Sequence, residues 1–232
     1  MRSARLLRYG AAFAFAFAFA FAFALATALA AAPAQPPEPA SGADDPKPAV
    51  KGADVIPSTF RSFIVTDKRT DAKDPLNRTN KLHCLVCENN LNPVVAVFAR
   101  SQPSAEDPLA KLVVELKKLL AVDKYKAQNL ASFVIFATLD KDFQSDDKRD
   151  LYAGAIRSWG ETVGAGGVVL GLTGEGNAAV KAWNLNKDDD ITVVLYQRMK
   201  MVRKPWTFEA GKMGDEDVKA IVAATEAELG KK

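Results

Sequence analysis

The segment PVVAVFAR, residues 93–100, decides the fold class. It is short, almost continuously apolar and rich in β-branched residues, which is typical of a strand covered on both faces of a sheet. A helix is predicted soon after it, because Asp107 suits the N-cap and Pro108 the first helical turn. Apolar residues then recur at helical spacing, and they are Leu109, Leu112, Val113, Leu116, Leu119 and Leu120. A buried strand followed by an amphipathic helix predicts an α/β domain.

The same order of strand and helix recurs along the rest of the chain. A buried strand is predicted over residues 131–139 and a helix over 147–163. The inner side of this helix is predicted to carry Leu151, Tyr152, Ala155, Ile156, Trp159 and Val163. The other predicted elements are an opening strand at 59–67, a strand at 166–173, a short helix at 177–183, a hairpin between 190 and 208, and a closing helix at 215–229. Strands joined by helices require a largely parallel centre, whereas the hairpin adds antiparallel edge strands.

Residues 1–34 have the features of a secretory signal peptide. Arg2, Arg5 and Arg8 precede an uncharged, mostly apolar run, and small residues around Ala30 and Ala34 suit a cleavage site. We therefore expect a secreted or periplasmic protein of the cell envelope. An uncleaved membrane anchor is the alternative, since the run is long enough to cross a bilayer as a helix.

The residues after the signal predict a linker and one folded domain. Residues 35–57 are rich in proline and contain nothing periodic to bury, so we predict a solvated linker followed by a domain at 58–232. The full chain has a net charge of +3, but residues 35–232 carry 28 basic and 28 acidic residues. This balance gives no reason to expect nucleic acid as a partner, and a membrane contact is expected only if the signal is uncleaved.

The stretch KLHCLVCENN, residues 81–90, holds the single histidine and both cysteines of the chain. Haem attachment requires CxxCH, and Glu88 occupies the position of that histidine. A structural zinc site requires four ligands, whereas His83, Cys84 and Cys87 supply three. We therefore predict no metal and no cofactor. Export favours a Cys84–Cys87 disulfide, which is either a structural staple or a pair that exchanges disulfides.

The order of elements from residue 93 to the closing helix resembles the thioredoxin-like superfamily. The additional strand and short helix between residues 166 and 183 resemble the insertion of the redoxins, which include peroxiredoxins and exported thioredoxin-like reductases. The resemblance implies a three-layer α/β sandwich with a mixed, mainly parallel central sheet. In this chain an N-terminal β extension would precede that sheet.

The chemical motifs of the superfamily are missing from their usual places. Its reactive cysteines follow the first central strand, where this chain has ARSQPSAEDP at residues 99–108. Its cis-proline precedes the hairpin, where this chain has Ile191 before Thr192. Cys84 and Cys87 come before the strand at 93–100, so we expect them near the opposite end of that strand, with too few residues before Pro93 to form a helix.

Two functions are compatible with this arrangement. In the first, Cys84 attacks a thiol or disulfide substrate, Cys87 resolves the mixed disulfide, and the imidazolium of His83 lowers the pKa of the Cys84 thiol. In the second, the chain is a non-catalytic binding or scaffold module for a protein partner, and the disulfide pins the loop that enters the sheet. The identity of the substrate or partner is not predicted.

Overall fold

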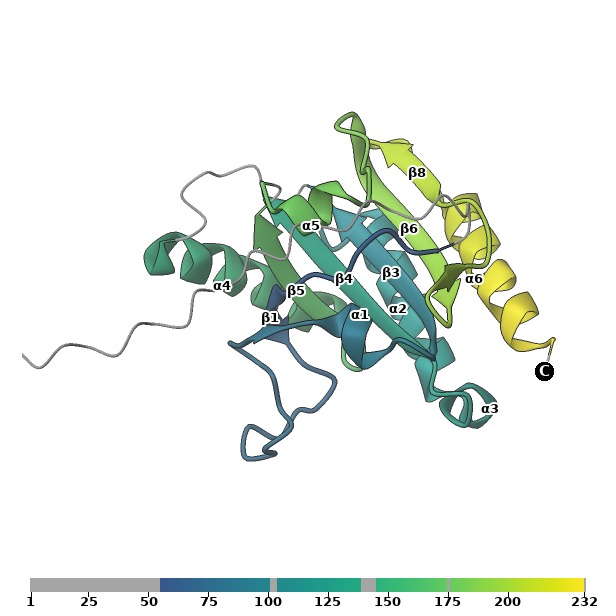
Figure 1. Ribbon diagram of the computed structural model, residues 1–232, viewed down its shortest axis with the longest axis horizontal. Helices are drawn as coiled ribbons and strands as arrows, with labels where there is room; N and C mark the ends of the chain where they lie inside the picture. Colours follow the sequence, from purple (N-terminus) through teal and green to yellow (C-terminus); the bar gives the residue numbers. More distant parts are fainter. Residues whose placement is uncertain (1–54, 101–103, 139–144, 175, 232) are drawn as a thin grey trace, which may run out of the picture. The chain divides into compact units, whose positions relative to one another are not determined.

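The computed structural model describes residues 55–100, 104–138, 145–174 and 176–231 (Figure 1). The predicted signal at 1–34 and nearly all of the predicted linker at 35–57 lie outside these residues. Val55 forms an antiparallel bridge with Lys200, and only 4% of Ile56 is exposed. Val55 and Ile56, which precede the predicted domain start at residue 58, therefore contact the folded domain.

Within the described residues, an eight-stranded sheet forms the centre of the domain. Its strands are β1 (Ser62–Thr66), β2 (Leu82–His83), β3 (Pro93–Ala99), β4 (Ala131–Thr138), β5 (Val169–Gly174), β6 (Asp189–Gln197), β7 (Lys200–Met201) and β8 (Trp206–Glu209). The strand order is β2-β1-β5-β4-β3-β6-β7, and β8 also pairs with β6. Parallel pairing joins β3 to β4 and β4 to β5, whereas the other pairings within the described ranges are antiparallel. The expected mainly parallel sheet is thus parallel only at its centre, because the N-terminal extension and the late hairpins both pair antiparallel.

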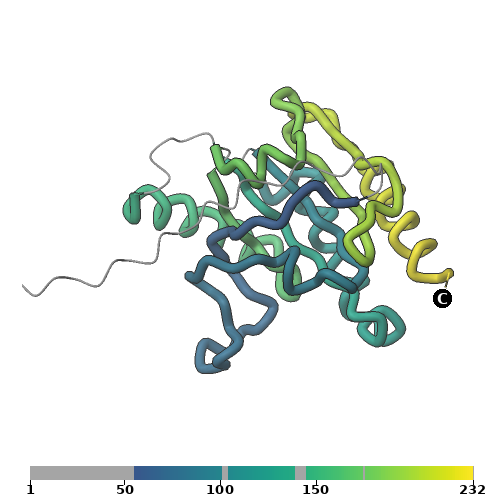
Figure 2. Tube along the Cα trace, in the orientation of Figure 1, coloured from purple at the N-terminus to yellow at the C-terminus, as the bar shows by residue number. Residues whose placement is uncertain are grey.

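Helices cover both faces of the sheet and give the domain three layers (Figure 1 and Figure 2). The helices are α1 (Leu85–Glu88), α2 (Pro108–Ala121), α3 (Asp123–Lys126), α4 (Asp146–Val163), α5 (Ala178–Lys181) and α6 (Asp215–Leu229). The apolar sides of α2, α4 and α6 share one core with the first face of the sheet. The second face shares its core with α1, α5 and the extended segment 56–60.

The position of β3 between two cores explains why its sequence is almost continuously apolar. Val95 and Val97 point into the first core, whereas Val94, Ala96 and Phe98 point into the second. All seven residues of the strand are buried, as expected for a strand covered on both faces. The predicted fold class is confirmed: an α/β sandwich of three layers with a mixed sheet and an N-terminal β extension, here β1 and β2.

Two details of the predicted helices are wrong. Leu151 is 69% exposed, although the helical pattern assigned it to the inner side of α4. The first turns of α4 extend past the sheet (Figure 1), and the side of the helix that carries Leu151 faces away from the core there. A helical turn, α1, also forms between the cysteines and Pro93, where too few residues were expected for one.

Candidate functional site

The two cysteines lie in the one-turn helix α1 and are joined by a disulfide, which confirms the predicted pairing. Their Cα atoms are 5.3 Å apart. Cys84 is the N-cap residue, and its Sγ accepts a hydrogen bond of 3.1 Å from the backbone N–H of Cys87. Cys87 is exposed, whereas Cys84 is partly buried against the second core. An external thiol would therefore reach Cys87 more readily than Cys84.

Neighbouring residues fix the conformation of this turn. A helix of four residues has no stability of its own in water, so tertiary contacts must hold it. Leu85 and Val86 are buried in the second core. Asn89, which is also buried, donates its side-chain N–H to the carbonyl of Leu85 at 2.9 Å and so caps the end of the turn. The chain places CxxC on a turn because two apolar residues between the cysteines anchor it to the sheet.

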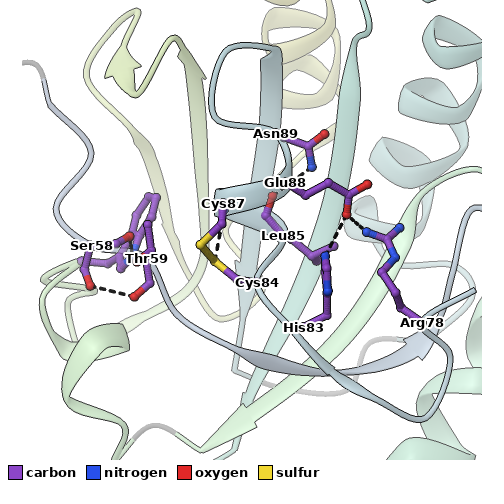
Figure 3. Close-up of a disulfide and its surroundings, with 10 residues drawn as sticks. Ser58, Thr59, Arg78, His83, Cys84, Leu85, Cys87, Glu88 and Asn89 are labelled. Atoms are coloured by element: carbon purple, nitrogen blue, oxygen red, sulfur yellow. Dashed lines mark hydrogen bonds and ion pairs between the residues drawn. A yellow bond between two sulfur atoms is a disulfide. The ribbon is translucent and has the colours of Figure 1, made fainter. Parts of the chain in front are cut away.

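His83 contacts a carboxylate and not a sulfur atom. Its Nε2 lies 3.0 Å from Glu88 Oε2. Figure 3 shows the disulfide directed toward Ser58 and Thr59, whereas the His83 ring extends on the other side, toward Glu88 and Arg78. Burial and the positive charge of Arg78 lower the pKa of His83 below its usual value, so the ring is mostly neutral at pH 7. The predicted stabilisation of a thiolate by its imidazolium stays a prediction, and this geometry gives it no direct contact.

A series of ion pairs connects the disulfide turn to the end of β1. Arg78 donates to both carboxylate oxygens of Asp67, with Nε–Oδ2 at 2.8 Å and Nη2–Oδ1 at 2.6 Å, and its Nη1 pairs with Glu88. Lys68 also pairs with Glu88, at 3.4 Å. Burial raises the pKa of Asp67, but the hydrogen bonds and charge of Arg78 outweigh this effect and hold the pKa well below its usual range.

Sequence reasoning did not identify Asp67, Arg78 or Glu88 as site residues. Glu88 served only to exclude haem attachment, and the other two lie in a polar segment with no recognisable motif. The sequence offers one weak signal of a charged site: Asp67 is a charged residue directly after the apolar strand that ends at Thr66. The pairing itself depends on how the loop between β1 and β2 folds, which spacing alone does not specify.

Redoxins carry their reactive cysteines at the other end of β3, and in this chain an arginine there binds backbone carbonyls of β6. Arg100 donates its backbone N–H to the carbonyl of Asp190 and its Nε to the carbonyl of Asp189. Ala99 pairs with Ile191, so this loop and the residue at the usual proline position lie side by side. Residues 101–103 of the loop lie outside the described part of the chain. The disulfide precedes Pro93, at the opposite end of a strand about 23 Å long at 3.3 Å per residue.

Within the ranges that the structure describes, no group of three or more His, Cys, Asp or Glu side chains is placed to hold a metal ion. No helix in those ranges has the length and apolar character to cross a membrane.

Comparisons with known proteins agree on the fold. No family model matches the chain, and no curated protein matches it. A protein from Chlorobium tepidum, provisionally named as the thiol:disulfide interchange protein DsbE, superposes with a TM-score of 0.50 and 15% identity over 78% of this chain and 99% of its own. An uncharacterised conserved protein from Geobacillus kaustophilus superposes with a TM-score of 0.51 and 13% identity over 78% of this chain and 84% of its own. The domain has a thioredoxin-like fold, and its Cys84–Cys87 disulfide precedes the central strand β3.

Proposed function

We propose that this chain is an exported thioredoxin-fold protein that exchanges disulfides with thiol substrates through Cys84 and Cys87. The observation that carries the proposal is the unequal exposure of the two cysteines on a turn held by buried neighbours. Cys87 is exposed to an incoming thiol, while the Sγ of Cys84 already accepts an N–H hydrogen bond. Hydrogen bonds to a thiolate favour the charged form, so Cys84 is suited to be the sulfur that leaves.

The exchange proceeds in two steps. A substrate thiolate attacks Cys87 Sγ and forms a mixed disulfide, and the Cys84–Cys87 bond breaks with its electron pair going to Cys84 Sγ. A second substrate thiolate then attacks the substrate sulfur of the mixed disulfide and releases Cys87 as a thiolate. The substrate thiols lose two electrons and two protons, and the cysteine pair gains both. The reverse sequence reduces a substrate disulfide.

This assignment reverses the roles expected from the sequence. The sequence predicts that Cys84 attacks and that Cys87 resolves the mixed disulfide, because His83 adjoins Cys84. His83 instead contacts Glu88, and exposure favours Cys87 as the sulfur that carries the mixed disulfide. α1 is too short to contribute a helix dipole, so the N–H of Cys87 is the stabilising group offered to Cys84.

A structural disulfide in a non-catalytic binding module is the alternative function. Closing a ring of about four residues contributes roughly 2 kcal/mol at most in the loop-entropy account. Leu85, Val86 and Asn89 already hold the same turn. A structural disulfide at this place would therefore add little stability. This favours disulfide exchange over a purely structural role.

Export is the second part of the proposal, and it rests on the sequence of residues 1–34. The basic start, the apolar run and the small residues near Ala30 and Ala34 support a cleaved signal. The mature protein should then begin between about residues 31 and 35 in a secreted or periplasmic fraction. An intact N-terminus in a carbonate-washed membrane fraction would instead indicate an anchor.

The experiment that tests the exchange uses an aromatic disulfide whose released thiol absorbs visible light. The reduced wild-type protein should release both halves of the reagent. Cys84→Ala should retain one half as a mixed disulfide at Cys87, detectable by mass, whereas Cys87→Ala should react more slowly because Cys84 is partly buried. The Cys84→Ala/Cys87→Ala double variant is the control. If neither single variant traps the reagent, and both lose equal stability, the pair is a staple.

A further inference from the structure

Arg78 joins the end of β1 to the disulfide turn. Its side chain is only 9% exposed, and two of its nitrogen atoms bind the carboxylate of Asp67, whose side chain is fully buried. Its remaining terminal nitrogen, Nη1, pairs with Glu88, which directly follows Cys87. One buried side chain thus links a buried carboxylate at the end of β1 to the residue next to the exposed sulfur. We call Asp67, Arg78 and Glu88 the arginine bridge.

The arginine bridge matters most when the sulfur–sulfur bond is open. α1 then depends on the burial of Leu85 and Val86, on the hydrogen bond from Asn89 and on the ion pairs of Glu88 at its end. Cys87 is exposed and contributes no burial of its own. The ease with which two thiols close a disulfide depends on their effective concentration, which falls when one of them gains freedom to move. A contact that holds residue 88 therefore also keeps Cys87 near Cys84.

We propose that Arg78 is a positioning residue for the Cys84–Cys87 pair, which it acts on by holding Glu88 against the buried Asp67. The bridge favours the disulfide over the dithiol and so lowers the reduction potential of the pair. This inference rests on the proposed exchange function for its biological meaning. The potential itself can be measured whether or not the protein is an enzyme.

The test compares Glu88→Ala with Glu88→Gln in the full chain, equilibrated with mixtures of reduced and oxidised glutathione. Both variants remove the charge, but only glutamine keeps an oxygen that can accept from Arg78. Work at about pH 6 keeps thiols of ordinary pKa, about 8.5, protonated, so charge effects on a thiolate drop out. Glu88→Ala should lower the equilibrium constant for disulfide formation about tenfold, the effect of losing one hydrogen bond to a charged group. This corresponds to a potential about 30 mV less negative.

The controls separate positioning from charge. Glu88→Gln should stay within about threefold of the wild-type equilibrium constant, since its amide oxygen replaces the lost acceptor. Glu115→Ala is the matched control, because Glu115 lies on α2 and pairs with Lys118 on the protein surface. Equal shifts in Glu88→Ala and Glu88→Gln would overturn the proposal, and so would the absence of a shift in Glu88→Ala. A shift in Glu88→Ala without any exchange activity would keep the bridge and reject the proposed function.

A second variant tests the Arg78 end of the bridge. Asp67→Asn/Arg78→Met removes both buried charges together, so no carboxylate is left buried without its partner. It should shift the equilibrium constant in the same direction as Glu88→Ala. Adding Glu88→Ala to it should cause a further shift well below tenfold, because the bridge is already broken and only the contacts of Glu88 with Lys68 and His83 are left to lose. An additional tenfold shift in the equilibrium constant would contradict the proposed role of the arginine bridge. If the double variant does not fold, the comparison of Glu88→Ala with Glu88→Gln decides alone.

Discussion

The two ends of β3 use polar side chains in different ways. At the Ala99 end, Arg100 donates to the backbone carbonyls of Asp189 and Asp190, which closes the loop where redoxins carry their cysteines. At the Pro93 end, Arg78 binds the carboxylates of Asp67 and Glu88 beside an exposed cysteine. Among the described residues, the first arrangement satisfies backbone carbonyl groups, whereas the second holds the turn that carries the disulfide.

Under the proposed exchange function, this difference means that the fold does not fix where its chemistry lies. The thioredoxin-like sheet supplies a rigid central strand with a loop at each end, and either loop can carry reactive residues. Here the cysteines occupy the loop before the strand. The following predictions test whether the Pro93 end is the functional one and the Ala99 end a structural one.

The largest expected effect is at the Pro93 end. Arg78→Ala should lower the free energy of unfolding by about 3–5 kcal/mol, because it removes both side-chain hydrogen bonds to the buried carboxylate of Asp67 and leaves that carboxylate only the longer ion pair with Arg69. Denaturant unfolding of the oxidised protein measures this loss. Lys118→Ala, which removes an exposed ion pair on α2, should cost less than about 1 kcal/mol. Equal losses in the two variants would mean that the Arg78 pair is not buried in solution.

The ion pair of Asp67 with Arg78 should make the folded protein less stable in acid. The pKa of Asp67 lies lower in the folded protein than its unfolded value of about 3.9, so its contribution is complete above about pH 5 and is lost as the pH falls below about 4. The expected contribution is about 2 kcal/mol. Unfolding free energies measured down the acid range should show this decline in the wild type, and Asp67→Asn/Arg78→Met should show a shallower one. A parallel decline in both proteins would assign the acid sensitivity to other carboxylates.

A moderate effect on stability alone is expected at the Ala99 end. Arg100→Ala should cost about 1–2 kcal/mol, because the carbonyls of Asp189 and neighbouring residues lose their donor. The reduction potential of the cysteine pair should not change, since that pair lies at the other end of β3. Unfolding and glutathione equilibration of the same variant measure both quantities. A changed potential would show that the two ends are coupled.

The smallest effect is expected for His83. His83→Ala should leave the thiol pKa values of the reduced protein within about 0.3 of the wild type, because a mostly neutral ring that binds Glu88 offers little charge to a thiolate. Titration of the thiolate absorbance measures this. A rise of about one pKa unit would restore the imidazolium role expected from the sequence.

The fold could be predicted from the sequence because its long elements are strongly periodic. The apolar run of β3 and the helical pattern of α6 follow from burial on two faces and on one face, respectively. Leu151 was misplaced because the pattern does not show where a helix leaves the sheet. The turn α1 was missed because the burial of Leu85 and Val86 stabilises it, which is a tertiary effect.

The candidate site could be predicted only in part. The pairing of Cys84 and Cys87 follows from their spacing and from the expected compartment, and it is confirmed. The contact of His83 with Glu88, the contact of Arg78 with Asp67 and the exposure of Cys87 were not predicted. Each depends on how a polar loop folds against the sheet, and loops of this kind have no hydrophobic period from which to read their course.

The reduction potential of the Cys84–Cys87 pair tests the central claim most directly, since that claim is disulfide exchange at the Pro93 end of β3. The full mature chain is equilibrated with glutathione or dithiothreitol buffers, and the oxidised fraction is read by mass after the thiols are alkylated. We predict a value between about −270 and −120 mV, the range of known thiol–disulfide oxidoreductases. A value below about −300 mV would identify a structural disulfide and would contradict the account.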